Sequence, residues 1–313
     1  MILFSTKDNP VPEGAEAGMI AAEDGVSLRF ARWRPEGATR GTVCVFPGRT
    51  EKIEKYFETA RDLIRRGFAV AVLDWRGQGG SQRLLRNAMK GHVDDFADYR
   101  ADVDAFMRQA VLPDCPSPFY ALAHSMGAAV MLDSARIGER LFDRMLLVAP
   151  MLELSLLKHD VAARRLARLL RGLGMSKLYV PTGKIKPLNE LHFDGNRLTS
   201  DPVRFARNLT ITLDHPQLDV GPPTIGWMAS AFDLMERFED PATARAIRQP
   251  LLIVAAGADR IVSTPAIEHF ARRLIAGSHV VIPGARHELL QERDIFREPL
   301  FAAFDAFIPG SAA

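Results

Sequence analysis

Short apolar runs alternate along this chain with segments of helical periodicity, and that alternation restricts the fold more than any other feature of the sequence. In six runs the apolar residues are continuous rather than alternating, which is typical of strands that are buried on both faces of a parallel sheet. These runs cover residues 41–48, 67–77, 119–125, 143–150, 250–257 and 278–284. The sequence therefore predicts a mostly parallel, doubly wound α/β sheet, opened by an antiparallel piece at residues 25–35.

One stretch interrupts the alternation. Between residues 151 and 240 no buried strand is predicted, but several helical patterns are separated by glycine and proline. We predict a helical insertion over residues 151–240, between two parts of an α/β core, residues 1–150 and 241–313. An insertion of this kind lies over the carboxyl edge of the sheet, where ligands bind in open α/β folds. It is therefore a candidate cap, or lid, over the binding site.

The composition narrows the classes of partner and compartment. A formal net charge of +2 over 313 residues is too small to indicate a nucleic-acid partner. The two cysteines, Cys44 and Cys115, can form neither a disulfide framework nor a metal cluster. The N-terminus lacks the pattern of a secretion signal, and no apolar run is long enough to span a membrane. We therefore expect a cytoplasmic protein, with peripheral contact to the inner face of the membrane left open.

Ser125 lies where a predicted strand meets a predicted helix, in the sequence Ala-His-Ser-Met-Gly at residues 123–127. A nucleophile elbow, written G-x-S-x-G, places its serine at such a corner. It needs small residues two positions before and after the serine, because the strand and helix backbones pass close together there. Ala123 and Gly127 meet that requirement, since alanine adds only one methyl group. Ser125 is therefore a candidate nucleophile, and a serine in an ordinary turn is the alternative.

A serine nucleophile needs a base and a carboxylate that orients the base, and in this architecture the acid follows the serine and the histidine comes last. Asp259 comes just after the fifth predicted strand and His287 just after the sixth, so both should lie at the same sheet edge as Ser125. Glu153, which follows the fourth predicted strand, is the competing acid. His124 is next to the nucleophile, and we expect its side chain to point away from the site.

Two backbone N–H groups must meet the negative charge that develops on the carbonyl oxygen of a substrate. The N–H of Met126 is one candidate, because it directly follows the nucleophile. The loop after the first predicted strand supplies the other, where Gly48 allows close approach and Arg49 carries the N–H. Glu51 in the same loop either fixes the loop or is solvated, and the sequence does not separate these alternatives.

Five segments together resemble the α/β-hydrolases, and within them the bacterial lysophospholipase and monoacylglycerol lipase branch. They are PGRTEKIEKY, LDWRGQGGS, HSMG, GADRIV and GARHELL, in this order along the chain. The resemblance implies an α/β-hydrolase fold and acyl transfer to water, with Ser125 as nucleophile, His287 as general base and Asp259 as the acid that orients it. It also implies oxyanion-hole N–H groups at Arg49 and Met126, and it implies no metal and no organic cofactor.

The resemblance leaves the substrate open, because the oxyanion loop begins with Pro47-Gly48 where many monoacylglycerol lipases have His-Gly. The first hypothesis is a small-molecule lipid ester with one acyl chain, such as a lysophospholipid or a monoacylglycerol. One alternative is a carboxylesterase for small soluble esters. Another is a ligand-binding protein that keeps the fold with little turnover. The oligomeric state is not predicted.

The insertion carries the remaining signals about the substrate. In residues 161–174 four arginines share one predicted helical face and four leucines share another (Arg164, Arg165, Arg168, Arg171; Leu166, Leu169, Leu170, Leu173). We favour a helix whose leucines pack on the core while its arginines are solvated. The alternative is a basic helix through which the cap contacts a lipid surface. Trp227, Met228 and Phe232 are candidates for lining an acyl pocket, or for the core of the cap.

Overall fold

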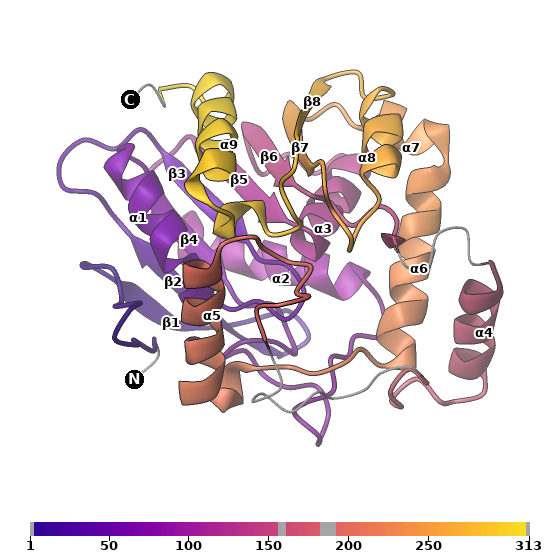
Figure 1. The fold of residues 1–313 in the computed structure, drawn as a ribbon. Coiled ribbons are helices and arrows are strands. Elements are labelled where there is room, and N and C mark those ends of the chain that lie inside the picture. The colour runs from indigo at the N-terminus through magenta and orange to yellow at the C-terminus, as the bar shows by residue number, and fades with distance from the viewer. Residues whose placement is uncertain (1–2, 156–160, 182–191, 311–313) are drawn as a thin grey trace.

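An eight-stranded sheet in the order β1-β2-β4-β3-β5-β6-β7-β8 forms the centre of the molecule (Figure 1). The computed structural model describes residues 3–155, 161–181 and 192–310. β1 pairs antiparallel with β2, and β2 with β4, whereas all the other neighbours are parallel. The predicted mostly parallel sheet with an antiparallel opening is therefore confirmed. The strands are β1 (Glu16–Ala21), β2 (Ser27–Trp33), β3 (Thr42–Phe46), β4 (Ala69–Leu73), β5 (Phe119–His124), β6 (Arg144–Val148), β7 (Leu251–Ala256) and β8 (Gly277–Ile282).

The six apolar runs all contain strands, but the last of them is not buried on both faces. β3, β4 and β7 are buried at every residue, as continuous apolar runs predict. β8 lies at the edge of the sheet, and its residues alternate between less and more exposed, with Val280 exposed over 42% of its surface. The expectation of full burial is wrong for this strand, because an edge strand is covered on fewer sides. β1, at the other edge, is largely exposed and has no continuous apolar run that could have predicted it.

Helices cover both faces of the sheet (Figure 1). α1 carries the chain from β3 to β4, whereas α2 and α3 carry it in the opposite direction across the sheet. Right-handed crossovers therefore place α1 on one face and α2 and α3 on the other. α9 lies beside α1, to which it is joined by an ion pair between Arg66 and Asp305 at 2.9 Å.

The helices have the following bounds. They are α1 (Phe57–Arg65), α2 (Ala97–Phe106), α3 (Met126–Arg136), α4 (Val161–Gly172), α5 (Pro202–Asp214), α6 (Ile225–Glu239), α7 (Pro241–Ala246), α8 (Thr264–Ala271) and α9 (Asp294–Phe307). Within the described ranges, none of them is long and apolar enough to cross a membrane.

The direction of winding reverses at β3, and this reversal determines where a ligand can bind. The chain leaves β3 toward β4 on one side, and later strands are added beyond β5 on the other side. Loops that follow the two strands on either side of such a reversal diverge and leave a crevice at the carboxyl edge of the sheet. The loop that follows β3 and the residue that follows β5 therefore adjoin the same crevice.

The segment between β6 and α7 is helical where it is described. Over residues 151–240 the described part contains α4, α5 and α6 but no strand longer than an isolated bridge, such as that between Tyr179 and Thr224. Residues 156–160 and 182–191 of the predicted insertion lie outside the described residues. The division into a core and a cap stays a prediction.

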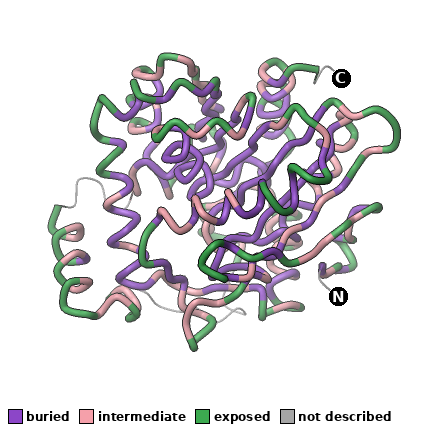
Figure 2. Tube along the Cα trace, turned by 180° about the vertical axis from the view of Figure 1, so that it is seen from behind, coloured by how far each residue is buried: buried purple, intermediate pink, exposed green. Residues whose placement is uncertain are grey.

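α4 packs against α6 through its arginines, which reverses the orientation that we favoured from the sequence. Three arginines of α4 pair with three acidic residues of α6 (Arg164 with Glu239, Arg168 with Asp233 and Glu236, Arg171 with Asp233). Three of the four leucines (Leu166, Leu169, Leu173) are exposed instead, with 59% of Leu169 and 66% of Leu173 accessible. Figure 2 shows exposed stretches along α4. The expectation of buried leucines and solvated arginines is wrong, because the acidic face of α6 attracts the arginines.

A buried arginine joins the loops that follow β3 and β4. Arg29 of β2 donates to Asp74, which directly follows β4, at 2.7 Å, and to both carboxylate oxygens of Glu54 at 2.7 and 2.8 Å. Asp74 also accepts the backbone N–H of Ile53 at 2.9 Å. A Cβ atom on Gly79 would lie 2.1 Å from this carboxylate, so only glycine fits there. These contacts hold the loops that follow β3 and β4 in place next to the crevice.

Candidate active site

Ser125 is the single residue between β5 and α3, and its backbone is strained. Its φ of 50° and ψ of −112° are rarely adopted by residues other than glycine. The end of β6 holds this conformation, because the Ser125 N–H donates to the carbonyl of Val148 at 2.9 Å and its carbonyl accepts from the Met151 N–H at 3.1 Å. Two further non-glycine residues with positive φ, Thr50 and Ala149, lie after β3 and β6 at the same sheet edge.

The residues two positions from Ser125 are packed as an elbow requires. A Cβ atom on Gly127 would lie 2.5 Å from the carbonyl oxygens of both Phe46 and Pro47, so no larger residue fits at that position. Ala123 pairs in register with Phe46 of β3 and is completely buried. The close approach of backbones is therefore on the Gly127 side, and the neighbouring strand tolerates the methyl group of Ala123.

His287 and Asp259 form a line of hydrogen bonds that ends on Ser125. The His287 Nε2 lies 3.0 Å from Ser125 Oγ, and its Nδ1 lies 2.8 Å from Asp259 Oδ2. The other carboxylate oxygen of Asp259 accepts the backbone N–H groups of Ile261 and Val262, at 2.7 and 3.0 Å. Burial raises the pKa of Asp259, but the hydrogen bond and charge of His287 and the two backbone donors outweigh it. The net pKa is below its usual value, so the carboxylate is ionised.

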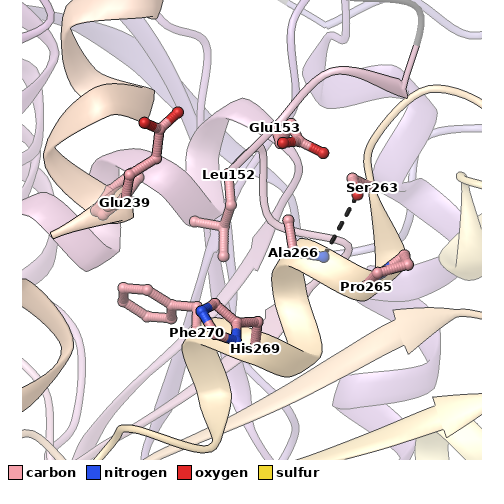
Figure 3. Close-up of a pocket in the computed structure, with 9 residues that line it drawn as sticks. Leu152, Glu153, Glu239, Ser263, Pro265, Ala266, His269 and Phe270 are labelled. Atoms are coloured by element: carbon pink, nitrogen blue, oxygen red, sulfur yellow. Dashed lines mark hydrogen bonds between the residues drawn. The ribbon is translucent and has the colours of Figure 1, made fainter. Parts of the chain in front are cut away.

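Glu153, the competing acid, lies in a different cavity. It lines a space of about 400 Å³ together with Leu152, Glu239, His269 and other residues of α6 and α8 (Figure 3). Neither Ser125 nor His287 lines that space. The structure therefore places Asp259, and not Glu153, at hydrogen-bond distance from His287 Nδ1.

Ser125 and His287 open into a cavity of about 270 Å³ whose walls are mostly apolar. Of the three candidates for an acyl pocket, Trp227 and Met228 of α6 line this cavity. Phe232, one turn further along α6, is buried in the hydrophobic core and does not line it. The apolar lining also includes residues that the sequence did not single out (Met151, Leu154, Leu198, Pro223, Ile261).

The two candidate oxyanion donors come from the loop after β3 and from the residue that follows Ser125. Met126 is the first residue of α3, and Arg49 lies in the loop after β3 and lines the cavity. Among the described residues, neither backbone N–H has a hydrogen-bond acceptor. Gly48 leaves room for this loop to approach, because a Cβ atom there would lie 2.9 Å from Glu51 and 3.0 Å from His124. Both N–H groups are thus free to donate to a bound ligand.

Glu51 is buried and fixes the loop after β3, so it is not the solvated side chain that the sequence left as an alternative. Its side chain is buried, and one carboxylate oxygen accepts from the Gly48 N–H and from the Tyr56 hydroxyl. The other oxygen accepts from Lys55 Nζ at 2.7 Å, and the same ammonium group lies 2.6 Å from Glu288. Burial raises the pKa of Glu51, but the charges of Lys55 and His124 lower it well below its usual value.

His124 does not point away from the site, and that expectation is wrong. Its ring lines the cavity, with its centroid 4.8 Å from that of His287. Nδ1 lies 3.1 Å from Glu51 Oε2, and Nε2 lies 3.1 Å from the backbone carbonyl oxygen of His287. An ionised carboxylate and a carbonyl can only accept hydrogen bonds, so both ring nitrogens must donate. This arrangement favours the protonated ring of His124, because only that form has two N–H donors.

The pKa of His124 agrees with that assignment. Burial lowers the pKa, but the charge and hydrogen bond of Glu51 raise it more, and the net value is above the usual one. The cluster of Glu51, Glu288, Lys55 and protonated His124 then contains two negative and two positive charges. Sequence reasoning did not find this cluster as a unit, because its members come from three segments and no spacing rule relates them.

The described residues contain no group of three or more His, Cys, Asp and Glu side chains that could hold a metal ion. The arrangement offers a hydroxyl with a histidine at hydrogen-bond distance, an oriented carboxylate, and two backbone N–H donors without an acceptor in the described part of the chain, beside an apolar cavity.

This chain is similar to known hydrolases. A family model described as serine aminopeptidase, S33, matches residues 37–294. Lysophospholipase L2 of Escherichia coli K12 is 34% identical over 298 residues, which cover 91% of this chain and 85% of that protein. Probable lysophospholipase L2 of Haemophilus influenzae is 29% identical over 275 residues, which cover 88% of this chain and 86% of that protein.

Solved structures show the same fold at low identity. A soluble variant of monoglyceride lipase from Saccharomyces cerevisiae, in complex with a substrate analog, has a TM-score of 0.76 at 18% identity, over 99% of this chain and 100% of that one. A monoacylglycerol lipase from Paleococcus ferrophilus has a TM-score of 0.69 at 21% identity, over 90% and 99% of the two chains. The predicted α/β-hydrolase fold is confirmed.

The raised pKa of His124 predicts how stability changes with pH. A histidine whose pKa is higher in the folded than in the unfolded protein stabilises the fold fully below the unfolded value, and that stabilisation is lost as the pH rises through the folded value. Replacing Glu51 with glutamine removes the charge that raises this pKa. We expect the free energy of unfolding of the wild type to fall above about pH 6.5, the usual histidine pKa, and the fall to be weaker in Glu51→Gln.

Urea unfolding between pH 6 and 9 measures how the free energy of unfolding of the two proteins depends on pH. Glu239→Gln is the control, because it removes a glutamate of α6 that lies outside the cluster. Nitrogen NMR of histidine-labelled protein checks the protonation state directly, since both ring nitrogens of His124 should carry a proton at neutral pH. Identical pH dependence in the wild type and Glu51→Gln would contradict the assignment of an imidazolium.

Proposed function

The chain belongs to the serine aminopeptidase S33 family and is a hydrolase, and from that premise we propose that it cleaves the carboxylic ester of a single-chain lipid through Ser125, His287 and Asp259. The observation that carries the proposal is the line of hydrogen bonds from Asp259 through His287 to Ser125, at 2.8 and 3.0 Å. Ser125 lines a mostly apolar cavity, which offers a place where an acyl chain can lie.

In the first half of the reaction, Ser125 Oγ attacks the ester carbonyl carbon while His287 Nε2 accepts the hydroxyl proton. The carbonyl oxygen becomes an oxyanion and accepts hydrogen bonds from the N–H groups of Arg49 and Met126. One such donor contributes about 3 kcal/mol to the stability of the transition state in other hydrolases. Asp259 holds the Nδ1 proton of the imidazolium. His287 then gives its proton to the leaving alcohol as the carbon–oxygen bond breaks, and the acyl group stays on Ser125.

In the second half, water replaces the alcohol. His287 removes a proton from the water as its oxygen attacks the acyl-enzyme, and the same two N–H groups stabilise the second oxyanion. When the bond to Ser125 breaks, Oγ takes the proton back from His287 and the fatty acid leaves. The cycle consumes one water and one ester, and it needs no group beyond the side chains and N–H donors already described.

Two features support a lipid ester as the substrate. The cavity walls beside Ser125 are formed by Met151, Leu154, Trp227, Met228 and Ile261, which favour an acyl chain. The similar proteins of Escherichia coli and Haemophilus influenzae are named as lysophospholipase L2 and probable lysophospholipase L2. The description of the family model, in contrast, names a peptidase. A carboxylesterase for small soluble esters remains the second candidate, and it differs from the first in chain-length preference.

We also propose that residues 151–240 act as a cap that meets the lipid surface. Leu198, Pro223, Trp227 and Met228 come from this segment and line the cavity, so it contributes directly to the site. On its outer side α4 presents exposed leucines, while three of its arginines are paired with α6. An apolar helical face on this segment would bind peripherally to lipid from which a substrate is drawn.

Replacing Ser125 with alanine should abolish hydrolysis and leave the fold intact. The substitution removes one hydroxyl group, and loss of the nucleophile in serine hydrolases lowers kcat on the order of 10⁶-fold. A fluorophosphonate probe should label the wild type and should not label Ser125→Ala. Ser134→Ala is the control, since Ser134 is a buried serine of α3 outside the site, and labelling should persist. Activity of Ser125→Ala near that of the wild type would mean that another residue is the nucleophile.

A series of p-nitrophenyl esters separates the two candidate substrates. Because the cavity walls are apolar, each buried CH₂ group of the acyl chain adds about 0.8 kcal/mol of binding. We therefore expect kcat/KM to rise from acetate to chains of eight or more carbons. A preference for acetate would exclude the lipid proposal in favour of a small-ester carboxylesterase.

Lipid contact through α4 predicts a loss of membrane binding without a loss of chemistry. We expect the double substitution Leu169→Glu and Leu173→Glu to weaken cosedimentation with phosphatidylglycerol-containing vesicles at least about tenfold, because two exposed leucines leave the contact. Hydrolysis of a soluble short-chain ester should stay near that of the wild type. Ile275→Glu, which changes an exposed isoleucine outside the insertion, is the control. Equal binding of all three proteins would contradict a contact through α4.

A further inference from the structure

Arg49 has a side chain that the proposed mechanism does not use. Only its backbone N–H is a candidate oxyanion donor, yet the residue as a whole lines the cavity that contains Ser125. The guanidinium group reaches toward the segment before α6, where Nη2 donates to the carbonyl oxygen of Gly221 at 2.5 Å. Its Cζ lies 5.1 Å from the centroid of the Trp227 ring.

No acidic side chain neutralises this guanidinium. Within the described ranges, no carboxylate oxygen lies within 4.0 Å of it, and its Nε is buried without a hydrogen-bond acceptor. The negative charge of Asp219 raises the pKa of Arg49 from a greater distance. Asp219 is itself paired with Lys52, whose Nζ lies 3.6 Å away. Burial lowers the pKa of Arg49 to about 10, which still leaves it positively charged at neutral pH.

The other cations at the cavity have acidic partners. Lys55 lies between Glu51 and Glu288, at 2.7 and 2.6 Å. His124 pairs with Glu51. Arg49 is therefore the cation that remains uncompensated among the charged groups described at this cavity. A cation held away from water without a counter-ion is unfavourable, and a ligand that brings a negative charge relieves that cost.

We propose that the Arg49 guanidinium binds the phosphate of a lysophospholipid, so that the site prefers an anionic leaving alcohol to neutral glycerol. This rests on the proposed function, since it identifies which single-chain lipid the site selects. A guanidinium group presents its N–H donors in a planar fork that matches two oxygens of a phosphate.

The reach of the side chain also fits. In a lysophospholipid the phosphate is separated from the ester oxygen by the three glycerol carbons. The guanidinium of Arg49 is separated from its own backbone N–H by the Cα atom and the side-chain stem, which is a comparable span. When the N–H of Arg49 holds the oxyanion, the phosphate of the same molecule is therefore within reach of the guanidinium of the same residue. The neutral head of a monoacylglycerol gains nothing from that charge.

The structural alternative is that Arg49 only ties the oxyanion loop to the segment before α6, through Gly221 and Trp227. The two roles differ in one measurable way. A structural tie affects every substrate alike, because all of them use the oxyanion loop, whereas a phosphate contact affects only substrates that carry the phosphate.

The first test compares two lipids with the same acyl chain, a lysophosphatidylglycerol and a 1-monoacylglycerol, presented in the same mixed micelles. Arg49→Met keeps the backbone N–H and an apolar stem but removes the charge. We expect the ratio of kcat/KM for the lysophospholipid to that for the monoacylglycerol to fall at least about tenfold, as loss of one charged hydrogen-bonded contact predicts. Parallel loss of both activities, with an unchanged ratio, would overturn the proposal.

Arg83→Met is the matched control. Arg83 also reaches from the core to the segment before α6, where it donates to the carbonyl oxygens of Gln217 and Asp219. It does not line the cavity of Ser125. Its loss should leave the ratio for the two lipids unchanged, whatever it does to the absolute rates. A fall of the ratio in Arg83→Met equal to that in Arg49→Met would assign the effect to a structural tie and overturn the proposal.

The second test does not depend on lipid hydrolysis. Glycerol 3-phosphate should inhibit the hydrolysis of p-nitrophenyl butyrate by the wild type competitively, and its inhibition constant should rise at least about tenfold in Arg49→Met. Glycerol is the neutral control and should not distinguish the two proteins. Inhibition of the wild type by glycerol 3-phosphate without any lipid hydrolysis would contradict the proposed function and keep the anion site. Absence of that inhibition would overturn the anion site itself.

Discussion

The buried carboxylate of Glu51 is the group on which the geometry of the site most depends. It accepts from the N–H of Gly48, from the Tyr56 hydroxyl, from Lys55 and from the ring of His124. A buried carboxylate is stable only when charged and hydrogen-bonded partners replace the water that it loses. Through His124 the contact extends to the backbone of His287. The loop that follows β3, the end of β5 next to Ser125 and the loop that contains His287 are thereby held by one acid.

The positions of the three candidate catalytic residues could be predicted from the sequence because they depend on local features. Ser125, Asp259 and His287 each follow a continuous apolar strand, and parallel strands end at one edge of a sheet. The packing at the elbow was equally predictable, since Gly127 must be small where two backbone carbonyls lie within 2.5 Å of its would-be Cβ atom. Neither inference requires knowledge of which side chains meet across the fold.

The charged cluster and the direction of α4 could not be predicted in the same way. The ring of His124 turns back into the site because the strand ends there and Glu51, far away in sequence, offers an acceptor. The leucines of α4 face outward because Asp233, Glu236 and Glu239 of α6 pair with its arginines. The spacing of those acids along α6 was the signal that could have predicted this orientation. The hydrophobic pattern of α4 alone predicted that its leucine face would be buried. β1 was missed for a related reason, since an exposed edge strand carries no apolar run.

Mass spectrometry of the enzyme quenched in acid during turnover of a lysophospholipid tests the central claim most directly. The account predicts an intermediate whose mass is increased by the acyl group, with the modification on the peptide that contains Ser125. It also predicts that the free glycerophosphate alcohol appears in a burst, in an amount equal to that of the acyl-enzyme. An adduct on another residue, or a head group rather than an acyl group on Ser125, would contradict the account.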